Sequence, residues 1–412
     1  MNKQRDNKTG KKRAFAALLF ALRMFAPAVS GFIISILVVH YFSKELWGSV
    51  ANISLWVFLF TGIASWGSKD YLLRQFSLEP SRITHVYSDS LLTRAILLPL
   101  LSAMLYFLTG RDIMLWLYCT AWLAARFVYT SFEPIVIFDK KFGMMAMTEL
   151  TGACIVAAYL LLTPTAPVTE DIIIVLMLAD ILKAVFVSLF FYRSLSFSHS
   201  VINTKHIIAA LPFFLIGMAG LLHSRLEQLI VNTFLSDTEK AYCQVYMNLL
   251  LASMAVPSLL ITPVTKSLYR ASAGTFKKIR IWLLRFGIFA APLSGIAVWC
   301  IVKFVYQFNS GLSILVAGIL FCIPVYFYFP AMYEAYKNGR QTLIMIVIAS
   351  CLVAGSISGF LIIREWGITG AIYNAAFTQW LMLLILLINS KRSVVSDDDV
   401  NVYEFHPTEP DL

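Results

Sequence analysis

The chain alternates long apolar stretches with short polar ones from end to end. Each apolar stretch is long enough to cross a hydrocarbon core of ~30 Å as a helix. The pattern therefore predicts an all-α integral membrane protein with about twelve transmembrane helices. They are expected at 14–40, 47–68, 90–109, 113–137, 147–163, 171–192, 207–235, 241–263, 281–306, 311–334, 341–363 and 367–389.

Four polar segments lie outside this pattern. Residues 1–13 form a basic tail, and the first apolar run after it is too long for a signal-peptide core, so it is expected to stay as a helix. Lys69–Asp89 is expected as a polar connection, and 391–412 as an acidic, disordered tail. The basic stretch 264–280 fits either an amphipathic interfacial segment or a plain basic loop.

The composition agrees with a membrane class. Hydrophobic residues make up 59% of the chain and charged ones 14%, with a mean hydropathy of +0.76. Soluble proteins average about 25% charged residues. In a soluble protein a formal charge of +10 would suggest binding to nucleic acid. Here most of the basic residues lie in the loops between the apolar stretches, so no nucleic-acid partner is expected.

The distribution of Lys and Arg predicts the orientation. With a cytoplasmic N-terminus, 24 of the 33 fall on the cytoplasmic side, five on the other side and four inside helices. Cytoplasmic loops carry this excess in membrane proteins. The alternation predicts that both termini are cytoplasmic.

The four cations inside helices are the candidate substrate-binding residues. Charges at the bilayer centre are expensive and usually face a cavity or a partner. All four are expected near the midplane, in both halves of the chain, and Arg pairs well with phosphate. They predict a cavity between two lobes that takes an anion, and they are Arg23, Arg126, Lys183 and Arg225.

Polar neighbours accompany these cations at helical spacing. Asp180 and Lys183 stand at i, i+3, while Arg126 and Glu133 stand at i, i+7, and either pair is equally well explained as structural neutralisation. Arg225 has Gln228 at i+3. The candidates for ion coupling are Glu133, Asp180, Glu227 and His223, the last two at i, i+4 on another face.

Catalytic and metal motifs are missing from the sequence. Gly62–Lys69 departs from a phosphate-binding loop by a Ser in place of Gly, and Asp397–Asp399 lies in the acidic tail without a fold around it. The pair Gly355 and Gly359 is expected to be a helix-packing face. No catalytic residue, metal site or cofactor is therefore expected.

Two stretches resemble the polysaccharide flippases of the O-antigen (Wzx) type, in the multidrug/oligosaccharidyl-lipid/polysaccharide (MOP) exporter superfamily. His40–Gly48 (HYFSKELWG) with Gly67–Arg74 is similar to the family's first external loop and the end of its second helix. Ser224–Asn232 (SRLEQLIVN) with Phe234–Tyr242 is similar to its seventh helix and the turn after it. The family's acidic position, often Asp, is Glu227, and its Gly before the Tyr is Ala241.

The resemblance implies a fold, a substrate and partners. It implies two six-helix lobes, at 14–195 and 205–390, that alternate access across a bacterial inner membrane. The substrate would be an undecaprenyl-diphosphate-linked oligosaccharide, carried from the cytoplasmic to the outer leaflet among membrane lipids. A polysaccharide polymerase and a chain-length regulator would be partners. The first alternative is a drug or metabolite antiporter of the same superfamily, and behind it stands a membrane-embedded polymerase or transferase. A flippase of lipid-linked peptidoglycan precursors is a further alternative, although such flippases usually have more helices.

Overall fold

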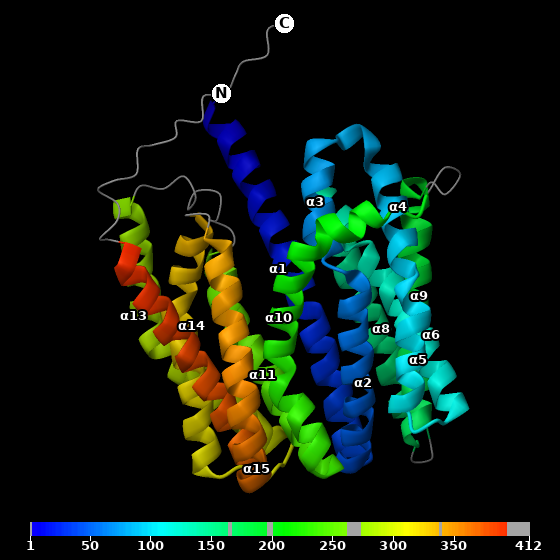
Figure 1. Ribbon diagram of the computed structural model, residues 1–412, viewed down its shortest axis with the longest axis vertical. Coiled ribbons are helices and arrows are strands. Elements are labelled where there is room, and N and C mark those ends of the chain that lie inside the picture. The colour runs from blue at the N-terminus through cyan, green and yellow to red at the C-terminus, as the bar shows by residue number, and fades with distance from the viewer. Residues whose placement is uncertain (1, 164–166, 196–200, 262–272, 338–339, 394–412) are drawn as a thin grey trace, which may run out of the picture.

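The computed structural model describes residues 2–163, 167–195, 201–261, 273–337 and 340–393. This part of the chain is helical and contains no strand. The long helices stand side by side in one bundle (Figure 1). They are α1 (Asn2–Tyr41), α2 (Lys44–Ser65), α3 (Ser68–Leu78), α4 (Ile83–Ala95), α5 (Leu97–Leu108), α6 (Ile113–Ser131), α7 (Glu133–Phe138), α8 (Phe142–Leu162), α9 (Thr169–Phe190), α10 (Thr204–Phe234), α11 (Asp237–Ile261), α13 (Ala273–Cys300), α14 (Leu312–Lys337) and α15 (Gln341–Ser393). Short 3-10 turns lie at Pro80–Arg82 and Tyr192–Ser194, and a π-helical turn at Ile301–Val305.

Twelve helical segments of the described ranges are long enough to cross a membrane, the number that the sequence predicts. Ten stretches are long and apolar enough to span a membrane. One of them, Thr342–Asn389, doubles back at Gly367, whose φ of 56° breaks α15 into two limbs. The 25 residues of α11 supply the twelfth crossing, because a helix of that length measures about 37 Å.

The predicted polar connection at Lys69–Asp89 is wrong in form. The structure has a helical hairpin there, α3 and α4, which stands beyond the bundle at the end where α1 begins (Figure 1). Its apolar side chains explain the difference. Tyr71, Leu72, Phe76 and Tyr87 are buried, and Tyr87 packs on Phe132. Polar residues thus cover one face of each helix and do not mark a loop.

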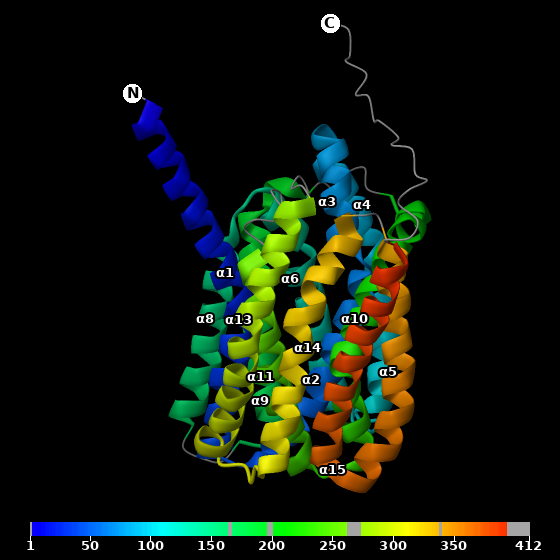
Figure 2. The same cartoon turned by 90° about the vertical axis from the view of Figure 1, so that its left-hand side faces the viewer.

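The N-terminal tail differs from the prediction, whereas most of the predicted acidic C-terminal tail is not described. Residues 2–13 continue α1 as a helix that extends past the bundle (Figure 2). At the other end α15 reaches Ser393, and the acidic segment from Val394 onward lies outside the described residues. Most of the basic stretch 264–280 lies outside them too, since the description resumes at Ala273.

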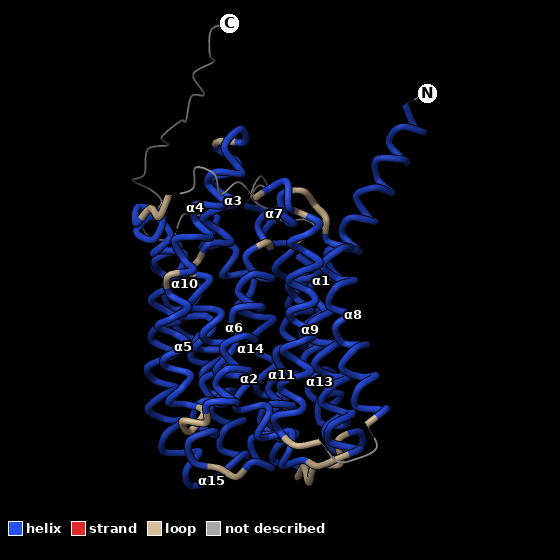
Figure 3. The backbone as a smooth tube through the Cα atoms, turned by 90° about the vertical axis from the view of Figure 1, so that its right-hand side faces the viewer, coloured by secondary structure: helices blue, strands red, loops and turns tan. Residues whose placement is uncertain are grey.

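The helices divide into two groups, which we call the N-lobe (α1–α9) and the C-lobe (α10–α15). In the N-lobe, α1 packs along α8 and α6 along α9. In the C-lobe, α14 packs against both α13 and α15, and α10 packs against α15. The contact of α2 with α11 is the most extensive one between the lobes. The short connections lie at the two ends of the bundle, clear of its middle (Figure 3).

The lobes are fastened together at the end that holds the α1–α2 connection. Ser49 donates to Asp237 at 3.2 Å and Thr238 donates to Glu45 at 2.7 Å, both between α2 and α11. The Lys44 ammonium donates to the carbonyl oxygen of Gln307 at 2.7 Å.

Two further features tighten this closure. A side chain at Gly48 would collide with the backbone of Asp237, so the glycine permits the close approach of α2 and α11. The Tyr306 hydroxyl lies 2.5 Å from that of Ser35 on α1, which adds a hydrogen bond between the lobes. The structure is therefore closed between the lobes at this end.

At the opposite end, α10 carries the described contacts between the lobes. The Trp66 indole donates to the carbonyl oxygen of Ile207 at 3.0 Å and its ring stacks on Phe214 at 4.0 Å. The Tyr71 hydroxyl lies 2.8 Å from Nδ1 of His206. The first turns of α10 thus lie on the N-lobe, whereas its last turns pack with α15.

Candidate functional site

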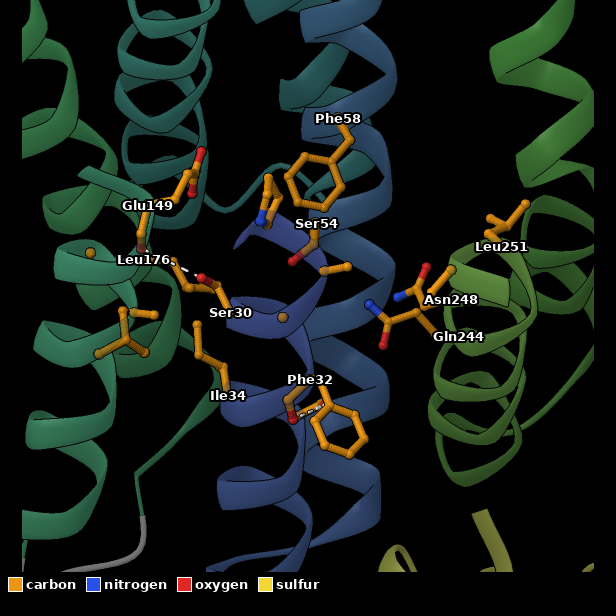
Figure 4. Close-up of a pocket in the computed structure, with 18 of the residues that line it drawn as sticks. Ser30, Phe32, Ile34, Ser54, Phe58, Glu149, Leu176, Gln244, Asn248 and Leu251 are labelled. Atoms are coloured by element: carbon orange, nitrogen blue, oxygen red, sulfur yellow. Dashed lines mark hydrogen bonds between the residues drawn. The ribbon is translucent and has the colours of Figure 1, made fainter. Parts of the chain in front are cut away.

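A cavity of about 590 Å³ lies between the two lobes. Its N-lobe wall comes from α1, α2, α6, α8 and α9, and its C-lobe wall from α10 and α11, with Tyr306 beside them. Ser30 and Glu149 lie on one side, and Gln244, Asn248 and Leu251 of α11 lie on the other (Figure 4). A largely apolar cavity with a few polar side chains is typical of a ligand site.

Three of the four predicted cations line this cavity. They are Arg126, Lys183 and Arg225, and the acids in the lining are Glu149 and Asp180. Because the lining holds more cations than acids, an anion is the favoured occupant by charge. Arg126, Lys183 and Arg225 thus lie at the wall of one cavity between the lobes, and their binding of a substrate stays a prediction.

The N-lobe wall holds a network centred on Asp180. This carboxylate is 4% exposed and accepts hydrogen bonds from Trp122 at 2.6 Å and Arg126 at 3.0 Å. The Lys183 ammonium lies 2.9 Å from its other oxygen. The predicted i, i+3 pair of Asp180 and Lys183 is therefore confirmed. Phe58 supports Arg126 from the cavity side, with the guanidinium 4.1 Å from the ring centre.

The predicted pairing of Arg126 with Glu133 is wrong. Helix α6 ends at Ser131, and Glu133 opens a new helix, so the two residues no longer share one helical face. Glu133 instead accepts an ion pair from Arg23 of α1 and another from Lys69 at 3.0 Å. Arg23 is 8% exposed and lies outside the cavity lining, so the predicted band of four cations separates into three and one.

Arg225 on the C-lobe wall has neutral partners. Its Nη1 donates to Gln228 at 3.0 Å and to Asn248 of α11 at 2.6 Å. Its described contacts include no acidic side chain. The predicted neighbour at i+3 is confirmed, and Arg225 is the cavity cation whose charge stays uncompensated within the described ranges.

Glu227 lies inside the C-lobe at 2% exposure. It accepts a hydrogen bond from Asn374 at 3.1 Å, and Asn374 accepts one from Ser358 at 2.6 Å. No cation pairs with Glu227 in the described part of the chain. The helical neighbour His223 has no hydrogen-bond partner at either ring nitrogen among the described residues. The two residues at i, i+4 thus do not form a bonded pair.

The pair of glycines on α15 packs as predicted. A side chain at Gly355 would meet Leu226 at 2.9 Å, and one at Gly359 would meet Ile230 at 2.7 Å, both on α10. The second limb of α15 also lies against these glycines, through Asn374. Their missing side chains let three helix segments approach closely around Glu227.

Sequence reasoning missed two charged residues. Glu149 lines the cavity, and its signal was an acid inside an apolar stretch, close to the expected start of that helix. Arg94 is 3% exposed but was assigned to the cytoplasmic connection. It donates to Ser90 and, at the ends of α2 and α6, to Ser65 and Ser131. The negative ends of these helices favour a cation there.

No family model and no curated protein sequence matches the chain. Solved structures do match. The lipid II flippase MurJ in an inward closed conformation shares 13% identity over 91% of this chain and 87% of its own, with a TM-score of 0.69. An inward-facing multidrug resistance MATE transporter of the MOP superfamily shares 12% over 94% and 100%, with a TM-score of 0.65.

A MATE transporter from Vibrio cholerae shares 11% identity over 95% of this chain and 98% of its own, with a TM-score of 0.61. The fold of this chain is similar to that of these solved flippase and transporter structures. At such identities the likeness concerns the fold, and the fold is compatible with a lipid flippase and with a drug antiporter alike. Transport across a membrane is the activity that these neighbours have in common.

Proposed function

We propose that the protein flips an undecaprenyl-diphosphate-linked oligosaccharide, such as an O-antigen repeat unit, from the cytoplasmic to the outer leaflet by alternating access. The uncompensated cation of the cavity, Arg225, carries this proposal. An arginine offers a phosphate two parallel hydrogen bonds that are strengthened by the opposite charges, and a neutral or cationic drug lacks that negative charge.

The cavity charge also fits the direction of transport. Moving an anion out of an inside-negative cell is favoured by about 2.3 kcal/mol per charge per 100 mV. MurJ, one of the structural neighbours, is named as a lipid II flippase, which supports a lipid-linked cargo. A polymerase with its chain-length regulator would consume the flipped unit at the outer face.

The alternative is a drug or metabolite antiporter, which the MATE neighbours favour. Against it stands the cavity lining, which holds three cations and two acids, whereas the export of cations calls for an acidic cavity. A polymerase or transferase is the weaker alternative, because the described connections at the α1–α2 end, such as Phe42–Ser43 and Leu235–Ser236, are too short for a catalytic loop.

Among the candidate coupling residues, Glu227 is favoured. Glu133 and Asp180 are each held by two cations, so a proton or sodium ion would have to displace an ion pair there. Glu227 is buried with a neutral partner, and a bound cation would offset the cost of its charge. His223 lies one turn away as a second titratable group.

The proposed orientation places both termini in the cytoplasm of a bacterial cell, in the inner membrane. The α1–α2 end of the bundle would then face outward. Reporter fusions after Lys141 and Arg340 are expected to read cytoplasmic, and one after Gly110 is expected to read external. An external signal at Lys141 or Arg340 contradicts this orientation.

A deletion strain tests the function. Loss of the protein is expected to remove a surface polysaccharide and to leave its undecaprenyl-diphosphate-linked unit in the inner leaflet. Wild-type protein expressed in this strain is expected to restore the polysaccharide, while Arg225→Gln at equal expression is not. Unchanged lipid intermediates together with a new drug sensitivity would instead favour the antiporter.

A further inference from the structure

Glu149 of α8 is a cavity carboxylate that the transport proposal has not used. Its side chain is 15% exposed and lies 2.8 Å from the Lys183 ammonium of α9. This is its one ion pair in the described part of the chain. Its main-chain carbonyl oxygen accepts a hydrogen bond from Ser30 of α1 at 3.4 Å. The carboxylate therefore lies where α1, α8 and α9 meet at the cavity wall.

A glycine on α8 leaves room for the Lys183 side chain to reach Glu149. Gly152 follows Glu149 by three residues and so lies on the same face of α8. A side chain at Gly152 would collide with Cε of Lys183. The Lys183 side chain thus passes over Gly152, which has no side chain, and contacts Glu149 beyond it.

Asp180 and Glu149 both contact Lys183, but they differ in the contacts that would remain if Lys183 moved away. Asp180 would keep Trp122 at 2.6 Å and Arg126 at 3.0 Å. Glu149 would keep no cation among the described residues. Asp180 therefore belongs to a network that survives the departure of Lys183, and Glu149 is the partner that an incoming anion has to displace.

We propose that Glu149 occupies Lys183 in the empty cavity and competes with the anionic group of the cargo for it; this inference rests on the proposed function. The competition lowers the affinity of the cavity for the diphosphate. It also returns Lys183 to its second acidic partner when the cargo leaves, so that release does not leave this buried ammonium with Asp180 alone. Glu149 thus sets affinity and turnover without contacting the cargo.

Binding of farnesyl diphosphate to the purified full-length protein tests this role by titration calorimetry. Glu149→Gln is expected to lower the dissociation constant about tenfold, the effect of freeing one charged hydrogen-bond donor. Glu149→Ala is expected to act in the same direction. Glu170→Gln is the matched control, because it removes the same charge from the exposed start of α9, and its dissociation constant is expected to equal that of the wild type.

The double variant Glu149→Gln with Lys183→Gln decides the mechanism. In the Lys183→Gln background, Glu149→Gln is expected to leave the affinity for farnesyl diphosphate unchanged, since the two substitutions act through one contact. A gain that persists without Lys183, or wild-type affinity in both Glu149 variants, overturns the inference. Equal binding by the wild type and Arg225→Gln would overturn the proposed function instead, so the two failures are distinguishable.

Discussion

Replacing Arg225 by glutamine removes the cavity cation that has no acidic partner among the residues that the structure describes. Both of its described hydrogen bonds, to Gln228 and Asn248, start from Nη1. Its Nε and Nη2 make no hydrogen bond in the described part of the chain. The substitution leaves no acid unpaired among the described residues. We therefore expect the variant to fold normally and to lose affinity for the cargo.

The size of the loss follows from the bonds that Arg225 would make with a phosphate. A hydrogen bond to a charged group contributes about 1.5–3 kcal/mol. At about 1.4 kcal/mol per factor of ten, the loss of one such bond raises KM about 10- to 150-fold. Arg225→Lys keeps the charge but offers a single nitrogen, so its KM is expected between those of the wild type and Arg225→Gln.

Flipping of a fluorescent undecaprenyl-diphosphate sugar in proteoliposomes measures this effect. Removing an interaction that is made equally with the bound cargo and with the transition state raises KM and leaves kcat unchanged. Arg364→Gln is the control, since it removes an exposed arginine of α15 outside the cavity lining. Wild-type KM in Arg225→Gln, with the protein folded and inserted, refutes the assignment of the anion site.

Three other substitutions test neighbouring features. Glu227→Gln keeps an acceptor oxygen and is expected to fold normally but to lose any dependence of transport on an ion gradient; full rate with full gradient dependence rejects the coupling role. Arg23→Ala leaves Glu133 with Lys69 alone and is expected to cost about 1–3 kcal/mol of folding stability, read as a lower melting temperature, with little change in KM. Gly48→Val places a methyl group against the backbone of Asp237 and is expected to lengthen spin-label distances across the α2–α11 end, and unchanged distances contradict the closure described here.

The sequence by itself determined the membrane class and the crossings. Hydrophobic length fixes where a helix spans a bilayer, so twelve crossings could be read from the chain. Contacts within one helix were equally accessible. The pairs of Asp180 with Lys183 and of Arg225 with Gln228 follow from 3.6 residues per turn, and the structure has both.

A prediction from helical spacing was wrong where the expected helix is interrupted. The expected pair of Arg126 and Glu133 required a continuous helix, but α6 ends before Glu133, and the new helix turns that side chain toward α1. The hairpin α3–α4 was missed for a related reason. Its polar residues cover the outer faces of amphipathic helices, and a search for long apolar runs does not detect such helices.

Only the tertiary structure decided which charges meet. Arg23 and Glu133 lie 110 residues apart, Arg126 and Asp180 lie 54 apart, and Glu227 and Asn374 lie 147 apart. Such partners depend on how each helix is rotated and packed against its neighbours, which hydropathy leaves open because lipid and protein interior are similarly apolar. The sequence therefore determined that cations lie inside the membrane, and packing determined that Arg225 alone among the predicted four lacks an acidic partner within the described residues.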